Sequence, residues 1–252
     1  MNDTDISIVI PAYNEEARLP RYLAEIQGYF APRPTSYEIV VVDDGSVDQT
    51  ARVVQEIAAL DSRVRLVRLP LNRGKGHAVR TGMLQACGRL QLFADADGAT
   101  PISQLERLLP ALERGADVAI ASRALRETGC AVQAHLHRKI MGAVFNFLVA
   151  AIAVRGIRDT QCGFKLFSKE AAQAVFPLQR IDDFGFDVEI LYLCGKRGLC
   201  VKEVPVTWSD IEGSKVGVVR DSLRMLGDLF KIRCNDLRGY YRPGGARPNL
   251  DG

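Results

Sequence analysis

The sequence predicts an α/β fold in which a mostly parallel β-sheet is flanked by helices. Apolar runs of strand length alternate with segments whose apolar residues recur at helical spacing. The runs are continuously apolar, which is typical of strands covered on both faces. At 252 residues, 47% of them hydrophobic and 25% charged, the chain is long enough to bury one sizeable core. We therefore expect a single elaborated domain.

Each of the first four predicted strands leads through a polar loop into a helix. Strands are expected over residues 6–10, 38–42 and 64–69, over the apolar run entering Asp95, and over residues 116–122. Leu19, Leu23 and Ile26 recur at helical spacing after the first strand. Asp48 is placed to cap the second helix.

Four polar loops directly follow these strands. They span residues 11–15, 43–46, 72–76 and 95–98. Ligands of open parallel sheets bind at the carboxyl ends of the strands. We therefore expect the four loops to line one crevice.

Asp95 and Asp97 stand two residues apart where the fourth strand ends. Residues at this spacing in a strand share a face, and carboxylate oxygens are the ligands that Mg²⁺ and similar hard cations prefer. The pair predicts a site for a divalent metal and a diphosphate. An acidic turn is the alternative from these residues alone, since Asp and Gly are common in turns.

Two other loops are ambiguous by themselves. Gly74 and Gly76 flank Lys75, but the segment lacks the third glycine of a dinucleotide fingerprint and the ending of a phosphate loop. Phosphate contact by Lys75 and a plain helix-entry turn both stay open. Asp44 could accept a hydrogen bond from a base or a ribose, or serve only as a turn residue.

Charge and cysteine content limit the class of partner and the compartment. The net charge is +3, but residues 123–169 carry eight Lys and Arg against two Asp and Glu. This asymmetry favours an anionic partner such as phosphate or a membrane surface. No nucleic-acid motif accompanies it, so nucleic acid is not an expected partner. Six cysteines without a C-x-x-C pair and an acidic start without a signal peptide favour the reducing cytoplasm.

Four segments, taken in order, resemble the successive motifs of family 2 glycosyltransferases. They are PAYNE at 11–15, VDDGS at 42–46, ADAD at 94–97 and DTQCGFK at 159–165. Residues 94–100 together with 159–165 most resemble the dolichyl- or polyprenyl-phosphate glucosyltransferases of that family. The resemblance implies a GT-A fold, a Rossmann-like and mostly parallel sheet flanked by helices.

The expected organisation follows from the extent of this resemblance. Residues 1–215 would form the GT-A transferase domain. Residues 216–242 would form a basic amphipathic C-terminal helix of the same domain, and residues 243–252 a disordered tail.

The resemblance also implies roles for single residues. Asp95 and Asp97 would share Mg²⁺ or Mn²⁺. The residues implied in nucleotide-sugar binding are Pro11, Tyr13, Glu15, Asp44, Lys75, Ala94, Asp95, Ala96, Arg123 and Arg138. Those implied in catalysis are Asp95, Asp97, Arg123 and Asp159. Candidates for holding the acceptor phosphate are Arg138, Lys165, Ser214 and Lys215.

The implied reaction is inverting, metal-dependent transfer of a hexose, glucose from UDP-glucose, to a dolichyl or polyprenyl phosphate. A lipid monophosphate is largely ionised at neutral pH, so no general base is strictly required. One alternative is a GDP-mannose-dependent transferase, although mannosyl relatives carry a metal-binding glutamine where this chain has Ala99. Transfer to a glycan hydroxyl, with Asp159 or another carboxylate as base, is a second alternative. A catalytically silent nucleotide-sugar-binding module is a third.

Two stretches could meet a membrane. The apolar run 140–154 is 15 residues long, short of the roughly 20 needed to span a bilayer. Residues 218–241 interleave apolar and basic side chains. Such helices can lie in the headgroup layer, which predicts peripheral binding to the cytoplasmic face of a membrane. Packing on the sheet or on a second subunit is the alternative.

Glu189, at the start of an apolar-periodic helix, is expected to be a buried or capping carboxylate.

Overall fold

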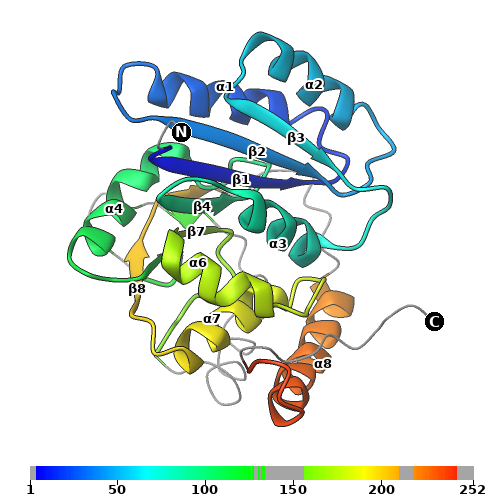
Figure 1. Ribbon diagram of the computed structural model, residues 1–252, viewed down its shortest axis with the longest axis vertical. Coiled ribbons are helices and arrows are strands. Elements are labelled where there is room, and N and C mark those ends of the chain that lie inside the picture. The colour runs from blue at the N-terminus through cyan, green and yellow to red at the C-terminus, as the bar shows by residue number, and fades with distance from the viewer. Residues whose placement is uncertain are drawn as a thin grey trace.

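A computed structural model describes residues 4–125, 127, 130, 132–133, 156–209 and 218–242. A seven-stranded sheet runs through the molecule in the order β3-β2-β1-β4-β7-β5-β8 (Figure 1). Its strands are β1 (Ile6–Ala12), β2 (Tyr37–Asp43), β3 (Val64–Arg68), β4 (Leu90–Ala94), β5 (Val118–Ser122), β7 (Phe164–Ser168) and β8 (Val201–Pro205). A separate parallel pair joins β6 (Val132–Gln133) to β9 (Trp208–Ser209).

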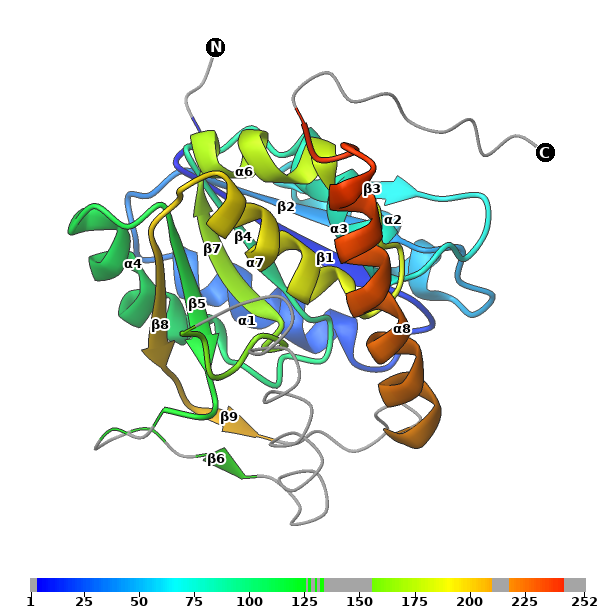
Figure 2. The same cartoon turned by 90° about the horizontal axis from the view of Figure 1, so that it is seen from below.

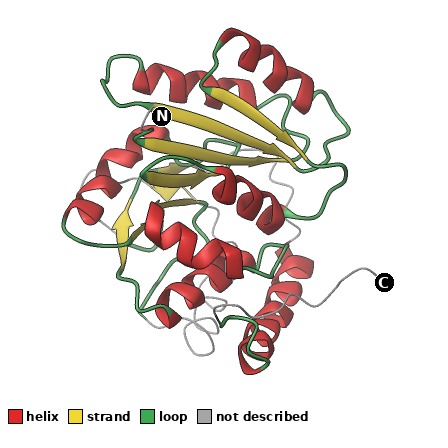
Figure 3. Cartoon of the chain, viewed as in Figure 1, coloured by secondary structure: helices red, strands yellow, loops and turns green. Residues whose placement is uncertain are grey.

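Helices occupy both faces of this sheet, and most of them separate consecutive strands (Figure 3). The α-helices are α1 (Leu19–Phe30), α2 (Thr50–Leu60), α3 (Lys75–Gln85), α4 (Leu105–Glu113), α6 (Lys169–Val175), α7 (Phe186–Lys196) and α8 (Val218–Leu237). Short 3₁₀ turns are η1 (Ile102–Gln104) and η2 (Phe176–Leu178).

The sheet is mostly parallel, as predicted. β1 lies between β2 and β4 and is parallel to both, and β5 is parallel to β8. Only β7 runs antiparallel, between β4 and β5. In register, Ala12 of β1 stands beside Asp43 of β2, so these strands end together. The loops that follow the parallel strands consequently meet at one edge of the sheet.

Two apolar layers explain why the strands are continuously apolar. Ile8 and Ile10 of β1 face the layer that contains α1, α2 and α4, whereas Val9 faces the layer that contains α3, α6 and α7. Both sets are fully buried because helices cover both sides of the sheet. Figure 2 shows α7 lying across the sheet with α8 beside it.

The helix α8 lies inside the segment 216–242 in which a C-terminal helix was expected. Where its side chains are described, Leu229 and Ile232 are buried and Phe230 and Leu237 are exposed. One face of this part therefore packs on the molecule and the other meets solvent. Residues 140–154, the apolar run that could meet a membrane, and residues 243–252, the predicted disordered tail, lie outside the described residues. In the described ranges, no helix combines the length and apolarity that crossing a bilayer requires.

Candidate active site

The loops at the carboxyl ends of the parallel strands enclose a cleft of about 410 Å³. All four loops predicted from the sequence contribute to it. The lining residues are Pro11, Ala12, Tyr13, Glu15, Arg18, Asp44, Asn72, Gly74, Lys75, Ala78, Asp95, Ala96, Asp97, Asp183 and Phe184. The expectation of one shared crevice is therefore confirmed.

Asp95 and Asp97 form an acidic pair that is partly neutralised by Lys75. The Nζ atom of Lys75 lies 2.6 Å from Oδ1 of Asp95. Burial opposes a charged lysine, but the carboxylate of Asp95 holds the pKa of Lys75 above its ordinary value. Burial, and then the charge of Asp95, raise the pKa of Asp97. Two carboxylates, Asp95 and Asp97, thus stand near one lysine, and Lys75 offsets only part of their negative charge.

The chemistry of this pair fits a hard divalent cation. Carboxylate oxygens suit Mg²⁺ and Mn²⁺, and Mg²⁺ is usually held by one or two carboxylates together with waters and substrate phosphates. The described residues contain no group of three or more His, Cys, Asp or Glu that could hold a metal ion. The described part of the chain thus offers Asp95 and Asp97, and other oxygens would complete the shell.

Gly163 determines the position of Asp95. The carbonyl of Gly163 accepts a hydrogen bond from the backbone N–H of Asp95 at 3.0 Å. A Cβ atom at position 163 would lie 2.1 Å from Oδ2 of Asp95 and 2.3 Å from its Cγ. Any side chain at this position must therefore displace the carboxylate.

We expect Gly163→Ala to reduce turnover about 100-fold, since misplacing a reacting group by about 1 Å can cost that much. Transfer assays at saturating metal measure this effect, and circular dichroism checks the fold. Gly195→Ala is the matched control, because a Cβ there meets no atom within 4 Å. Wild-type turnover in Gly163→Ala would show that the position of Asp95 does not matter.

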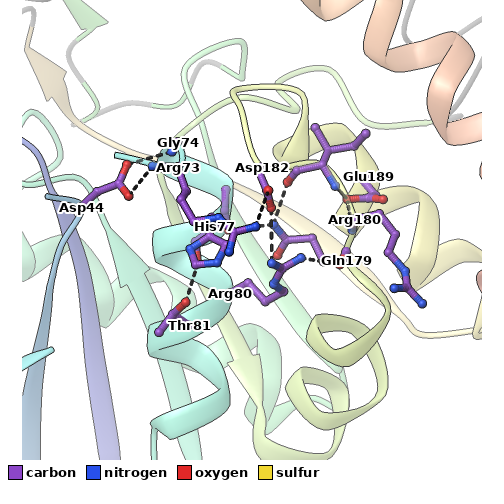
Figure 4. Close-up of polar contacts among 12 residues, drawn as sticks. Asp44, Arg73, Gly74, His77, Arg80, Thr81, Gln179, Arg180, Asp182 and Glu189 are labelled. Carbon is purple, nitrogen blue, oxygen red and sulfur yellow. Dashed lines mark hydrogen bonds and ion pairs between the residues drawn. The ribbon is translucent and has the colours of Figure 1, made fainter. Parts of the chain in front are cut away.

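Asp44 holds the glycine loop in place (Figure 4). Its Oδ1 accepts a hydrogen bond from the backbone N–H of Arg73 at 2.9 Å, and its Oδ2 accepts one from Gly74 at 2.8 Å. Burial raises the pKa of this carboxyl. Gly74 has a φ of 107°, a conformation that favours glycine. Contact between Asp44 and a base or ribose stays a prediction.

Arg18 is a cleft residue that the sequence analysis missed. Its Nε and Nη2 donate to the carboxylate of Glu15 at 2.7 Å and 2.5 Å. These hydrogen bonds raise the pKa of Arg18, and the charges of Asp97 and Asp95 add to the effect. The spacing of Glu15 and Arg18 by three residues at a helix start is the signal that could have paired them.

Arg123 and Asp159, both predicted to be catalytic, form a paired unit. Oδ2 of Asp159 accepts from the backbone N–H and Nε of Arg123, both at 2.8 Å, and Oδ1 accepts from Nη2 at 2.9 Å. Burial opposes ionisation of Asp159, yet Arg123 holds its pKa below the ordinary value. Such a carboxylate is a weak base. The arginine also lies over the ring of Trp208, 5.3 Å from its centroid.

Lys165, a predicted candidate for holding the acceptor phosphate, does not line the cleft. Lys165 lies in β7 and is fully buried. Its Nζ donates to the carboxylate of Asp187 and, at 2.8 Å, to the carbonyl of Cys162. Side chains of a strand alternate between faces, and this one points into the layer of α7, where Phe93 covers it. The ammonium group is thus committed to an internal ion pair.

The remaining predicted site residues divide into two groups. Ala96 lines the cleft, whereas Ala94 is buried at the end of β4 and does not line it. Arg138, Ser214 and Lys215 lie outside the described residues. Their roles in phosphate binding stay predictions.

Comparison with known proteins identifies the family. The sequence model described as Glycosyl transferase family 2 matches residues 7–176. The chain belongs to glycosyl transferase family 2. It is accordingly a glycosyltransferase, as the motifs at 11–15, 42–46, 94–97 and 159–165 predicted.

This family 2 transferase is similar over most of its length to dolichyl-phosphate β-glucosyltransferases. Identity to the Drosophila melanogaster enzyme is 42%, covering 94% of this chain and 77% of the relative. Identity to the Homo sapiens enzyme is 40%, with the same coverage of both chains. The Saccharomyces cerevisiae enzyme is 37% identical over 94% of this chain and 76% of the relative.

Solved structures confirm the GT-A fold. Mannosyl-3-phosphoglycerate synthase from Rubrobacter xylanophilus superposes with a TM-score of 0.68 at 21% identity, covering 99% of this chain and 79% of that one. Glucosyl-3-phosphoglycerate synthase from Mycobacterium tuberculosis, in complex with Mg²⁺ and uridine-diphosphate, gives 0.67 at 18% identity, with 91% and 79% covered. At these identities the likeness concerns the fold.

Proposed function

We propose that this transferase moves glucose from UDP-glucose to a dolichyl or related polyprenyl phosphate and inverts the anomeric centre. The observation that carries the proposal is the acidic pair Asp95 and Asp97, placed with Lys75 in a cleft that four strand-end loops build. The relatives that match nearly the whole chain carry the name of this activity. The product would be a β-linked lipid-phosphate glucose.

Asp95 and Asp97 would hold Mg²⁺ or Mn²⁺ in this proposal. The bound ion supplies a Lewis acid that stabilises the charge developing on the departing diphosphate. Lys75 adds a second positive charge in the same cleft. Pro11 and Tyr13 form part of the wall against which the nucleotide would lie.

The acceptor oxygen would attack directly in this mechanism, without a protein base. A phosphate monoester is largely ionised at neutral pH and already carries a nucleophilic oxygen. Asp159, the carboxylate considered as a base for a glycan hydroxyl, uses both oxygens to hold Arg123. This commitment favours a phosphate acceptor over a hydroxyl acceptor. Arg123 would be oriented by Asp159 toward a phosphate group, the kind of anion that a guanidinium binds well.

Transfer to lipid phosphate tests the whole proposal. Purified protein in detergent would receive labelled UDP-glucose, Mg²⁺ or Mn²⁺ and dolichyl phosphate, and the lipid phase would be extracted. We expect label in the lipid phase only when metal and lipid phosphate are both present. Label that appears on added glycans, or on nothing at all, would favour the hydroxyl-acceptor alternative or the silent binding module.

We expect UDP to bind more tightly than GDP. In mannosyl relatives of this family a glutamine holds the metal where this chain has Ala99, a buried residue whose N–H donates to Asp97 at 3.0 Å. Calorimetric titration of both nucleotides at equal metal concentration measures the preference. Equal or stronger binding of GDP would indicate a mannosyl donor.

We also propose that the protein works on the cytoplasmic face of a membrane, as a peripheral protein. The acceptor phosphate lies in the headgroup layer, and the described part of α8 exposes Phe230 and Leu237 near Lys231, Arg233 and Arg238. Cations near an anionic membrane surface contribute about 1 kcal/mol each. In liposome flotation we expect binding that requires anionic lipid and weakens with salt. Flotation indifferent to lipid charge and salt would contradict the proposal.

A further inference from the structure

Residues 179–184, which we call the strap, lie between η2 and α7 and form part of the wall of the cleft. Asp183 and Phe184 of the strap line the cleft together with the glycine loop, residues 72–76. None of the motifs found in the sequence includes the strap. Its position therefore depends on contacts that only the folded chain makes.

The strap touches the glycine loop and the start of α3 backbone to backbone. The carbonyl of Asp182 accepts a hydrogen bond from the N–H of His77 at 3.1 Å. A Cβ at Gly74 would lie 2.5 Å from that same carbonyl oxygen. A Cβ at Gly76 would lie 2.5 Å from the carbonyl oxygen of Ile181. The two glycines thus permit a close approach, which any displacement of the strap would open.

Glu189 of α7 holds the other side of the strap (Figure 4). Its Oε2 accepts hydrogen bonds from the backbone N–H groups of Arg180 at 2.9 Å and Ile181 at 2.8 Å. Its Oε1 accepts from the hydroxyl of Tyr241, just beyond α8, at 2.5 Å. Glu189 and Tyr241 are both fully buried.

Burying a carboxylate costs free energy, because the ionised group loses its hydration. Burial raises the pKa of Glu189 to about 7, although its three donors and the charge of Arg80 oppose the shift. An apolar side chain of similar size would pack at least as favourably but could not accept hydrogen bonds from the strap. The contacts of Glu189 therefore point to a role in placing the strap.

We propose that Glu189 is a positioning residue that holds the strap against the glycine loop, and that Tyr241 thereby couples donor affinity to the position of the end of α8. The inference rests on the proposed function, in which the cleft binds a uridine nucleotide. A chain of hydrogen bonds leads from Tyr241 through Glu189 to the backbone of the strap at Arg180 and Ile181. The strap in turn binds the glycine loop, because the side-chain amide of Gln179 donates to the carbonyl of Gly76 at 2.8 Å. Coupling between two such places is reciprocal.

Two variants break this chain at different points. Tyr241→Phe removes the hydroxyl, and Glu189→Ala removes the acceptor of both strap amides. We expect the Kd of UDP, measured by calorimetry with metal, to rise about tenfold in each, within the usual range of such couplings. kcat at saturating UDP-glucose should stay within about twofold, because the reacting groups are untouched. Hydrogen exchange at the amides of Arg180 and Ile181 should accelerate.

Glu189→Gln and Tyr192→Phe are the controls. The glutamine keeps an oxygen for both strap amides, so the Kd of UDP should return to within about threefold of the wild type. The hydroxyl of Tyr192 donates to Asp236 at 2.5 Å and joins α7 to α8 without reaching the strap. Tyr192→Phe should therefore change neither UDP affinity nor exchange at the strap.

Unchanged UDP affinity in folded Tyr241→Phe and Glu189→Ala would overturn the inference. A loss of UDP affinity in Tyr192→Phe as large as in these two variants would also overturn it. If Glu189→Ala does not fold, Tyr241→Phe alone decides. A wild-type protein that does not bind UDP would instead refute the proposed donor. Exchange at the two strap amides, measured without nucleotide, would then still decide whether Glu189 holds the strap.

Discussion

Asp97→Asn should reduce glucosyl transfer about a thousand-fold or more, the upper range for removing one group that stabilises transition-state charge. The substitution takes a negative charge from the acidic pair while keeping the shape of the side chain. Its amide oxygen can still accept the hydrogen bond from Ala99, which Asp97 accepts at 3.0 Å. We therefore expect the free energy of unfolding to be unchanged or slightly higher, since burial and Asp95 disfavour the ionised form.

Initial rates over a range of Mg²⁺ and Mn²⁺ concentrations measure this effect, and urea unfolding checks stability. Asp61→Asn is the matched control, because Asp61 lies at the end of α2, binds Gln27 and Arg63, and does not line the cleft. Near-normal turnover of Asp97→Asn at saturating metal would refute the metal assignment.

Lys165→Met should lower the free energy of unfolding by about 3–5 kcal/mol, the usual cost of leaving a buried charge without its partner. Lys165 is fully buried, and its ion pair with Asp187 has both side chains inside the protein. Methionine fills a similar space but leaves the buried Asp187 carboxylate without the lysine that donates a hydrogen bond to it. Urea unfolding of the wild type and the variant measures the loss.

Two further variants distinguish a structural from a binding role for this lysine. The double variant Lys165→Met with Asp187→Leu removes both charges and should recover most of the lost stability. Lys169→Met, at the start of α6, should be nearly neutral because the hydrogen bond from its Nζ to the carbonyl of Cys87, at 3.4 Å, lies in an exposed place. If Lys165→Met kept full stability and lost only the use of lipid phosphate, the original phosphate assignment would be right.

Much of the fold was predictable because strand and helix periodicity are local properties of a sequence. The predicted strands correspond to β1 through β5, although individual boundaries differ by a few residues. β7 and β8 were missed for a physical reason. β7 contains a buried lysine, and β8 is a partly exposed edge strand, so neither is a continuous apolar run.

The candidate site was predicted in its composition but not in its internal pairing. Asp95, Asp97 and Lys75 were expected at one edge of the sheet, and they line one cleft there. The ion pair between Lys75 and Asp95 was not expected, because nothing in the sequence shows which cation stands beside which carboxylate. Arg18 was missed because a single arginine at a helix start is common on exposed surfaces.

The sequence by itself determined the α/β class, the four strand-end loops, the acidic pair and the family. These follow from short-range patterns and from motifs whose order along the chain is itself informative. Only the tertiary structure decided that Lys165 is internal, that Asp159 is committed to Arg123, and that the strap forms a wall of the cleft. Each of these depends on a partner distant in the chain, such as Asp187 for Lys165 or His77 for Asp182. Burial and pairing at such distances depend on which strands and helices come together, so they appear only once the sheet has formed.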